Sequence, residues 1–152
     1  MSDLSIDTRF GKLTPLAEDE AIVGLRWDAG VAGAASPLVR EACRQLRAYA
    51  DGRLERFDLP LKLTGSAFQQ AVCAVIRDIP FGETMTYGEI AKQLGAPAQA
   101  VGGACGGNPI PVIIPCHRVM GAGDRLVGFS GTGGVETKVA LLRHEGAASL
   151  LI

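Results

Sequence analysis

The 152-residue sequence has no long apolar run and no dominant charge of either sign. No stretch reaches the roughly 18 uninterrupted apolar residues of a membrane-spanning helix, so we expect no membrane segment. Lysine and arginine number 15 against 16 aspartates and glutamates, which removes the usual electrostatic argument for a nucleic-acid partner. With 47% hydrophobic residues, the composition is typical of a globular protein with a true core.

Cysteine and histidine are too sparse for a metal site or a disulfide framework. The two histidines do not stand at zinc-finger spacing from a cysteine pair, and no Cys-x-x-Cys pair occurs. The N-terminus lacks a basic region followed by an apolar run, so we expect a cytoplasmic protein with reduced thiols. A structural disulfide stays a less favoured alternative among the four cysteines: Cys43, Cys73, Cys105 and Cys116.

The first half of the chain predicts a small antiparallel sheet followed by a helix. Two short extended stretches, 5–10 and 21–27, are bounded by turn residues. Ser36 and Pro37 then provide a cap and a first-turn proline for an amphipathic helix that ends near residue 51. Residues 53–64 show no clean period and are interpreted as a surface linker, which separates a domain of residues 1–60 from one of 65–152.

The second half predicts a helical domain that contains a helix-turn-helix. Capping boxes begin helices after Ser66 and Thr86, and Pro97 opens a third helix, which runs to about Cys105. The last two helices are joined by a turn at Gly95, as in a winged helix-turn-helix. Together with the N-terminal sheet, this pattern predicts a mixed α/β (α+β) fold.

The C-terminal part combines an apolar stretch with a final helix. Residues 110–114 are β-branched and apolar, and we expect them to be extended. Residues 134–145 predict a helix with Val135, Val139 and Leu142 facing inward.

An excess of glycine, 20 residues in all, leaves two interpretations of the helix-turn-helix open. Helix-turn-helix pairs bind DNA grooves, but they also occur as plain packing units. Each glycine inside a helix costs about 1 kcal/mol relative to alanine. Close approach to another surface and tight packing within the protein explain equally well the glycines at 102, 103, 106 and 107.

A second candidate feature is the cysteine-histidine pair in the segment Pro115–Val119, which reads Pro-Cys-His-Arg-Val. An imidazole beside a thiol can take its proton, provided that the backbone turns there and a carboxylate orients the ring. The alternative is a core cysteine next to an incidental histidine.

These segments together resemble the 6-O-alkylguanine-DNA alkyltransferases over residues 65–152. The resemblance rests on Pro115–Val119, on Asn-Pro at 108–109, on Thr-Tyr-Gly-Glu-Ile-Ala at 86–91, and on Gly-Phe at 128–129 with Lys138. It implies a DNA-repair methyltransferase that moves an alkyl group from the 6-oxygen of guanine, or the 4-oxygen of thymine, to its own cysteine once. It also implies a monomer that binds double-stranded DNA through the minor groove and needs no metal or cofactor.

The resemblance assigns roles to individual residues. Cys116 would be the nucleophile, and His117, oriented by Glu145, would accept the thiol proton through a water. Asn108 would brace the cysteine turn, and Tyr87 would press on the phosphate beside the target and donate to the flipped base.

Further roles concern the guanine and the duplex. The carbonyls of Cys116 and Val119 would accept from the guanine amino group, and the backbone N–H of Ser130 would donate to its oxygen. Arg118 is among the basic residues available for a phosphate contact. The resemblance places the start of the recognition helix in the minor groove, with Ala98, Gln99, Ala100, Gly102 and Gly103.

The sequence departs from the family pattern at Gln99, where the family has an arginine that fills the gap left by the flipped base. Glutamine is shorter and uncharged, so our hypothesis is that Gln99 weakens base flipping and leaves the cysteine chemistry intact. A damaged-DNA-binding relative with poor repair activity is therefore the main alternative function. A methylation-sensing regulator, which would need an additional metal-binding domain, and a thiol hydrolase are less favoured.

Overall fold

The computed structural model describes residues 5–27, 36–121 and 134–147. The chain divides into two compact units, residues 1–63 and 64–152. Within the described residues, a three-stranded antiparallel sheet and five α-helices confirm the predicted mixed α/β class. None of the helices in these ranges has the length and apolar character needed to cross a membrane.

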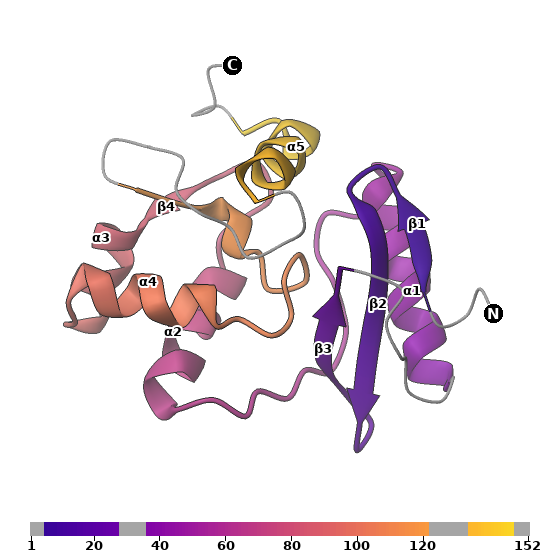
Figure 1. The fold of residues 1–152 in the computed structure, drawn as a ribbon, viewed down its shortest axis with the longest axis horizontal. Helices are drawn as coiled ribbons and strands as arrows, with labels where there is room; N and C mark the ends of the chain where they lie inside the picture. Colours follow the sequence, from indigo (N-terminus) through magenta and orange to yellow (C-terminus); the bar gives the residue numbers. More distant parts are fainter. Residues whose placement is uncertain (1–4, 28–35, 122–133, 148–152) are drawn as a thin grey trace. The chain divides into compact units, whose positions relative to one another are not determined.

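The first unit is built on a sheet in the order β1 (Ile6–Thr8), β2 (Gly11–Glu18) and β3 (Ala21–Arg26) (Figure 1). The sequence predicted the two outer strands and missed β2, because Pro15 interrupts its pattern. A proline inside a sheet is tolerated at edges and irregularities, and Pro15 lies next to a register shift in the β2–β3 ladder.

Helix α1 (Pro37–Ala50) packs on this sheet, and Ser36 caps it by accepting a hydrogen bond from the Val39 backbone N–H, as predicted. The following segment is less free than a surface linker. The Gln45 side chain both donates to and accepts from the Asp58 backbone, at 2.9 and 2.8 Å, and Leu61 bridges to β3. Residues 58–62 are therefore anchored to the first unit.

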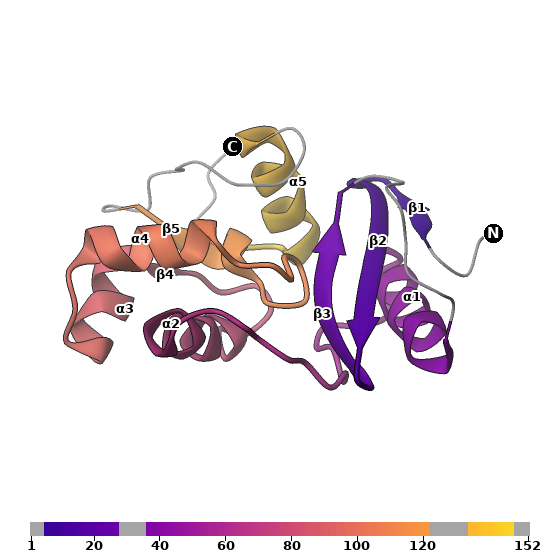
Figure 2. The same cartoon turned by 60° about the horizontal axis from the view of Figure 1, so that its bottom comes forward.

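The second unit carries the other helices around a short parallel strand pair (Figure 2). The pair joins β4 (Met85–Thr86) to β5 (Val119–Met120). The α-helices are α2 (Ala67–Arg77), α3 (Tyr87–Leu94), α4 (Ala98–Gly106) and α5 (Val135–Glu145), and one 3-10 helix, η1, covers Cys116–Arg118.

The predicted helix-turn-helix is formed by α3 and α4. Thr86 and Glu89 form both bonds of a capping box at the start of α3, and Gly95 ends it in the left-handed conformation with φ 66°. Helix α4 turns Val101 and Cys105 inward, one helical turn apart, against α2 and α3. Its exposed positions carry small residues apart from Gln99.

Two local expectations were wrong. Residues 110–114 do not form a strand: Ile113 donates to the Pro111 carbonyl, and Val112 has φ 71°, so the segment is a buried turn. In α5, the inward position expected for Leu142 is confirmed, but Val135 is 40% exposed, and Lys138, Leu141 and Glu145 are the other buried residues. The apolar stripe was partly misplaced because a lysine and a glutamate occupy buried positions of this helix.

Candidate active site

Cys116 is the first residue of the 3-10 helix η1 and is only 3% exposed. The backbone turns tightly around it, because the Cys116 N–H donates to the Ile114 carbonyl at 2.7 Å and the Arg118 N–H donates to the Pro115 carbonyl at 2.9 Å. This turn replaces the extended geometry in which neighbouring side chains point to opposite faces. It provides the bend that the cysteine-histidine interpretation required.

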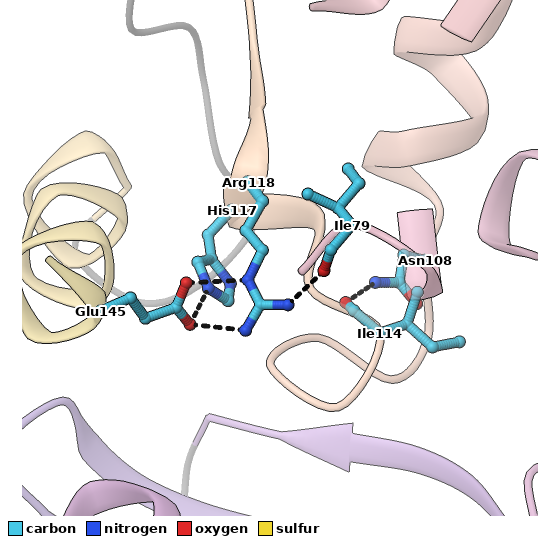
Figure 3. A network of polar contacts seen from close by, with 6 residues as sticks. All are labelled: Ile79, Asn108, Ile114, His117, Arg118 and Glu145. Atoms are coloured by element: carbon cyan, nitrogen blue, oxygen red, sulfur yellow. Dashed lines mark hydrogen bonds and ion pairs between the residues drawn. The ribbon is translucent and has the colours of Figure 1, made fainter. Parts of the chain in front are cut away.

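Asn108 braces the turn that precedes Cys116. Its side-chain amide donates to the Ile114 carbonyl at 2.9 Å, and its oxygen accepts from the Ile110 N–H at 2.9 Å. Both ends of the 110–114 turn are thus tied to one buried side chain, which comes from the loop directly after α4 (Figure 3). A left-handed β-branched residue costs roughly 1–3 kcal/mol, and this brace holds Val112 in that conformation.

The His117 ring contacts the Glu145 carboxylate, with Nε2 and Oε2 2.7 Å apart and both side chains fully buried (Figure 3). Burial lowers the pKa of His117, so the ring is neutral. Burial alone would raise the pKa of Glu145, but hydrogen bonds and charge from His117 and Arg118 bring it down to about 2. A neutral ring beside a carboxylate donates through Nε2–H, which leaves Nδ1 as a proton acceptor. Nδ1 is buried and has no partner among the described residues.

Arg118 lies on the other side of the same carboxylate, contrary to the expected phosphate contact. Its guanidinium donates to both Glu145 oxygens, at 2.8 and 3.0 Å, and to the Ile79 carbonyl at 2.6 Å. The side chain is 6% exposed and lies over the Phe81 ring. The bidentate geometry that suits arginine to phosphate is used here for an internal carboxylate, so Arg118 connects η1 to the C-terminus of α5.

Two further side chains that the sequence analysis did not place at the site, Cys105 and Lys138, lie near Cys116. The Cys105 thiol donates to the Cys116 carbonyl oxygen, with Sγ and O 4.0 Å apart. Interaction with the Cys105 side chain, with Asn108 and with the charge of Lys138 holds the pKa of Cys116 below its ordinary value against the opposing effect of burial. The inward spacing of Val101 and Cys105 on α4 is the signal that would have indicated Cys105.

Tyr87 and Val119 lie near this cysteine pair. Tyr87 is the half-buried first residue of α3, and burial together with the neighbouring Cys105 thiol raises the pKa of its hydroxyl. The Val119 carbonyl accepts from Lys138 Nζ at 2.5 Å, so one of its two acceptor positions is already used within the protein. Ser130 lies outside the described residues. Within those residues, no group of three metal-ligating side chains could hold an ion.

The exposed side of α4 distinguishes the two explanations of its glycines. A Cβ atom built on Gly102, Gly103 or Gly106 would meet nothing within 4 Å, so packing inside the described protein does not require a glycine there. Gly107 differs, because its Cβ would lie 2.7 Å from the Gln69 side-chain nitrogen. The start of this helix is exposed at Ala98, Gln99 and Ala100, and of these three residues only Gln99 has a longer side chain.

Comparison with known proteins finds relatives of the second unit and of the whole chain in one and the same family. Residues 67–147 match the model of the 6-O-methylguanine DNA methyltransferase DNA-binding domain. The chain belongs to this methyltransferase family. A methylated-DNA–protein-cysteine methyltransferase from Methanosarcina acetivorans is 49% identical over 110 residues, which cover 71% of this chain and 69% of the relative. One from Mycolicibacterium paratuberculosis is 49% identical over 116 residues, 73% of this chain and 69% of that protein.

Solved structures of the methyltransferase family resemble the full fold. An O6-methylguanine methyltransferase from Mycobacterium tuberculosis has a TM-score of 0.81 and 40% identity, covering 97% of this chain and 94% of that one. The M. tuberculosis OGT in complex with DNA has a TM-score of 0.82 and 42% identity, covering 95% of this chain and 94% of its own. The family likeness therefore extends to the first unit, beyond residues 65–152, over which the sequence resemblance was found.

The Glu145 carboxylate, which contacts both His117 and Arg118, gives a prediction about stability in acid. Glu145 has a pKa of about 2 in the folded protein against 4.5 as its ordinary value. A lowered folded-state pKa stabilises the fold above the unfolded value, so this contribution should be lost as pH falls from about 4.5 to 2. Glu145→Gln should lower the free energy of unfolding by about 3 kcal/mol at neutral pH, since it leaves Arg118 buried without its charge partner.

Urea unfolding at a series of pH values measures this effect. The exposed Glu136 on the same helix provides the control, because Glu136→Gln should leave the pH dependence of the parent protein in place. If Glu145→Gln lost stability in acid as steeply as the parent, the stabilising role of the carboxylate would be refuted.

Proposed function

We propose that this chain repairs alkylated DNA by transferring a methyl or other alkyl group from the 6-oxygen of guanine to the Cys116 sulfur. The observation that supports the proposal most directly is a buried thiol of lowered pKa beside a histidine whose Nδ1 is left as an acceptor. Burial ordinarily makes a cysteine inert, and this arrangement counteracts that effect. Glu145 would act by orienting the imidazole and holding its Nε2 proton.

The transfer would proceed in one displacement. His117 takes the Cys116 proton through a water, and the thiolate attacks the alkyl carbon. A carbon–sulfur bond forms as the carbon–oxygen bond breaks, and the electron pair of that bond stays on the guanine. Tyr87, at the start of α3, donates a proton so that the guanine leaves neutral. The thioether on Cys116 is stable, so each molecule reacts once.

The helix-turn-helix would bring the guanine to the thiol. The reactive carbon lies inside the duplex stack, so the nucleotide has to be flipped out at a cost of a few kcal/mol. The exposed small residues of α4 let a backbone approach the minor groove closely. Gln99, exposed at the start of this helix, is the side chain available to hydrogen-bond to the base left without a partner.

The proposal assigns the reaction to the domain of residues 65–152, with residues 1–60 as a separate domain. A cytoplasmic location fits this chemistry, because the reaction needs a reduced thiol. The carbonyls of Cys116 and Val119 and the N–H of Ser130 remain the proposed contacts to the guanine.

Mass mapping of the protein after incubation with a methylated-guanine duplex tests the function. We expect one added methyl group on the peptide that contains Cys116 and none on Cys43, which lies in the first unit. Cys116→Ala should abolish the transfer, whereas Cys43→Ala should leave it unchanged. Binding to the methylated duplex without any adduct would instead support the damage-binding alternative.

The open glycines of α4, at 102, 103 and 106, predict that an added methyl group has opposite effects on stability and on repair. Gly103→Ala should raise the free energy of unfolding by up to about 1 kcal/mol, because the site is helical and open. It should also slow the reaction with methylated duplex, since a methyl group then stands between backbone and groove. The reaction with free benzylated guanine should not change. A gain in stability with an unchanged duplex rate would refute the groove contact.

Gln99→Arg tests the proposed weakness in base flipping. We expect a faster single-turnover reaction with methylated duplex, because arginine can stack in the gap and pair with phosphate. The rate with free benzylated guanine should stay the same, since no flipping is involved. Gln99→Lys is the matched control for charge alone, and an equal gain in that variant would attribute the effect to electrostatics rather than stacking. An unchanged duplex rate in Gln99→Arg would disprove the hypothesis.

A further inference from the structure

The second thiol beside Cys116 is not used by the proposed reaction. Cys105 lies in the last turn of α4 and is 5% exposed, so its thiol is held against the site rather than in solvent. Its S–H donates to the Cys116 carbonyl oxygen, with Sγ and O 4.0 Å apart. Cys116 offers this proton a second acceptor, its own sulfur, and each of the two thiols shifts the pKa of the other.

The groups that interact with Cys116 come from the four described α-helices of the second unit and from the segments at Asn108 and His117. They are Cys73 of α2, Tyr87 of α3, Cys105 of α4, Asn108 after α4, the adjacent His117, and Lys138 of α5. His117 is neutral, and Lys138 is hydrogen-bonded to the Val119 carbonyl. Cys105 and Asn108 are the two neighbours whose polar side chains lower the pKa of Cys116.

Building on the proposed role of Cys116 as the nucleophile, we propose that Cys105 is a positioning residue whose S–H turns from the Cys116 carbonyl to the Cys116 sulfur when that sulfur ionises. A thiol is a weak donor to a neutral sulfur but a better one to a thiolate, because a charged acceptor strengthens the bond. No backbone movement is needed, since rotation about one side-chain torsion redirects the proton. The reacting atoms remain those of Cys116 and the alkyl group.

The direction of the pKa changes agrees with this geometry. The contact with Cys116 raises the pKa of Cys105, so Cys105 keeps its proton, while the same contact lowers the pKa of Cys116. Cys73 is the contrast: burial raises the pKa of its thiol to about 11, and no hydrogen bond to Cys116 contributes. One buried thiol thus assists ionisation of Cys116, and the other is only its neighbour.

The test is the pH dependence of Cys116 alkylation by iodoacetamide, followed by mass mapping in the full chain. Cys105→Ala and Cys105→Val remove the donor with opposite changes in volume, and Cys105→Ser retains a donor. We expect the midpoint for Cys116 to rise by about one pH unit in the first two variants, as for loss of one hydrogen bond to a charged group. Cys105→Ser and Cys73→Ala should keep the midpoint of the parent.

The outcomes separate this proposal from a packing role and from the proposed function. An unchanged midpoint in Cys105→Ala and Cys105→Val would overturn it, as would a midpoint that follows side-chain volume or an equal shift in Cys73→Ala. If one variant does not fold, the others give the same comparison. Failure of the parent protein to react with alkylguanine would refute the function, whereas the iodoacetamide profile would still report on Cys105.

Discussion

One buried carboxylate connects the parts of the second unit that carry the site. Glu145 ends α5, yet its two oxygens serve His117 and Arg118 of η1, and Arg118 continues to the Ile79 carbonyl after α2. A buried ion pair need not stabilise more than apolar packing would, but removing one partner leaves an uncompensated charge. The contacts of Glu145 thus fix both the His117 imidazole and the arrangement of these three segments.

Helix α4 shows a different balance, between the stability of the helix and the access of a partner to its backbone. Gly102, Gly103 and Gly106 weaken α4, and no packing atom of the described residues lies within 4 Å of their Cβ positions to account for them. The inner side of the helix meanwhile carries Val101 and Cys105 into the core. A short helix that is close-packed on one side and bare on the other can bring its backbone near a partner. The near-neutral charge of the chain means that such contact relies on shape more than on long-range attraction.

Local signals in the sequence predicted most of the helices but not the course of the chain between them. The capping box at Thr86 and the stop at Gly95 act within a few residues, so they can be recognised without tertiary context. The buried turn at residues 110–114 could not, because β-branched residues favour strands, whereas the Asn108 side chain and the backbone bonds of the turn hold Val112 in a left-handed conformation. Arg118 was misassigned for the same reason: its partner is 27 residues away, so its burial depends on a contact that composition does not reveal.

Charge balance at the site also bears on the proposed ionisation of the buried Cys116 thiol. The buried charged side chains described in the second unit are the cations Arg118 and Lys138 and the anion Glu145, while His117 is neutral. In the proposed reaction the Cys116 proton passes to His117, so the thiolate and the imidazolium form as a pair and the net charge of the site does not change. A thioether on Cys116 would be uncharged, like the neutral thiol. Because an unpaired buried charge is costly, the excess of positive charge at the site favours the thiolate over the neutral thiol, and a thioether would not offset that excess.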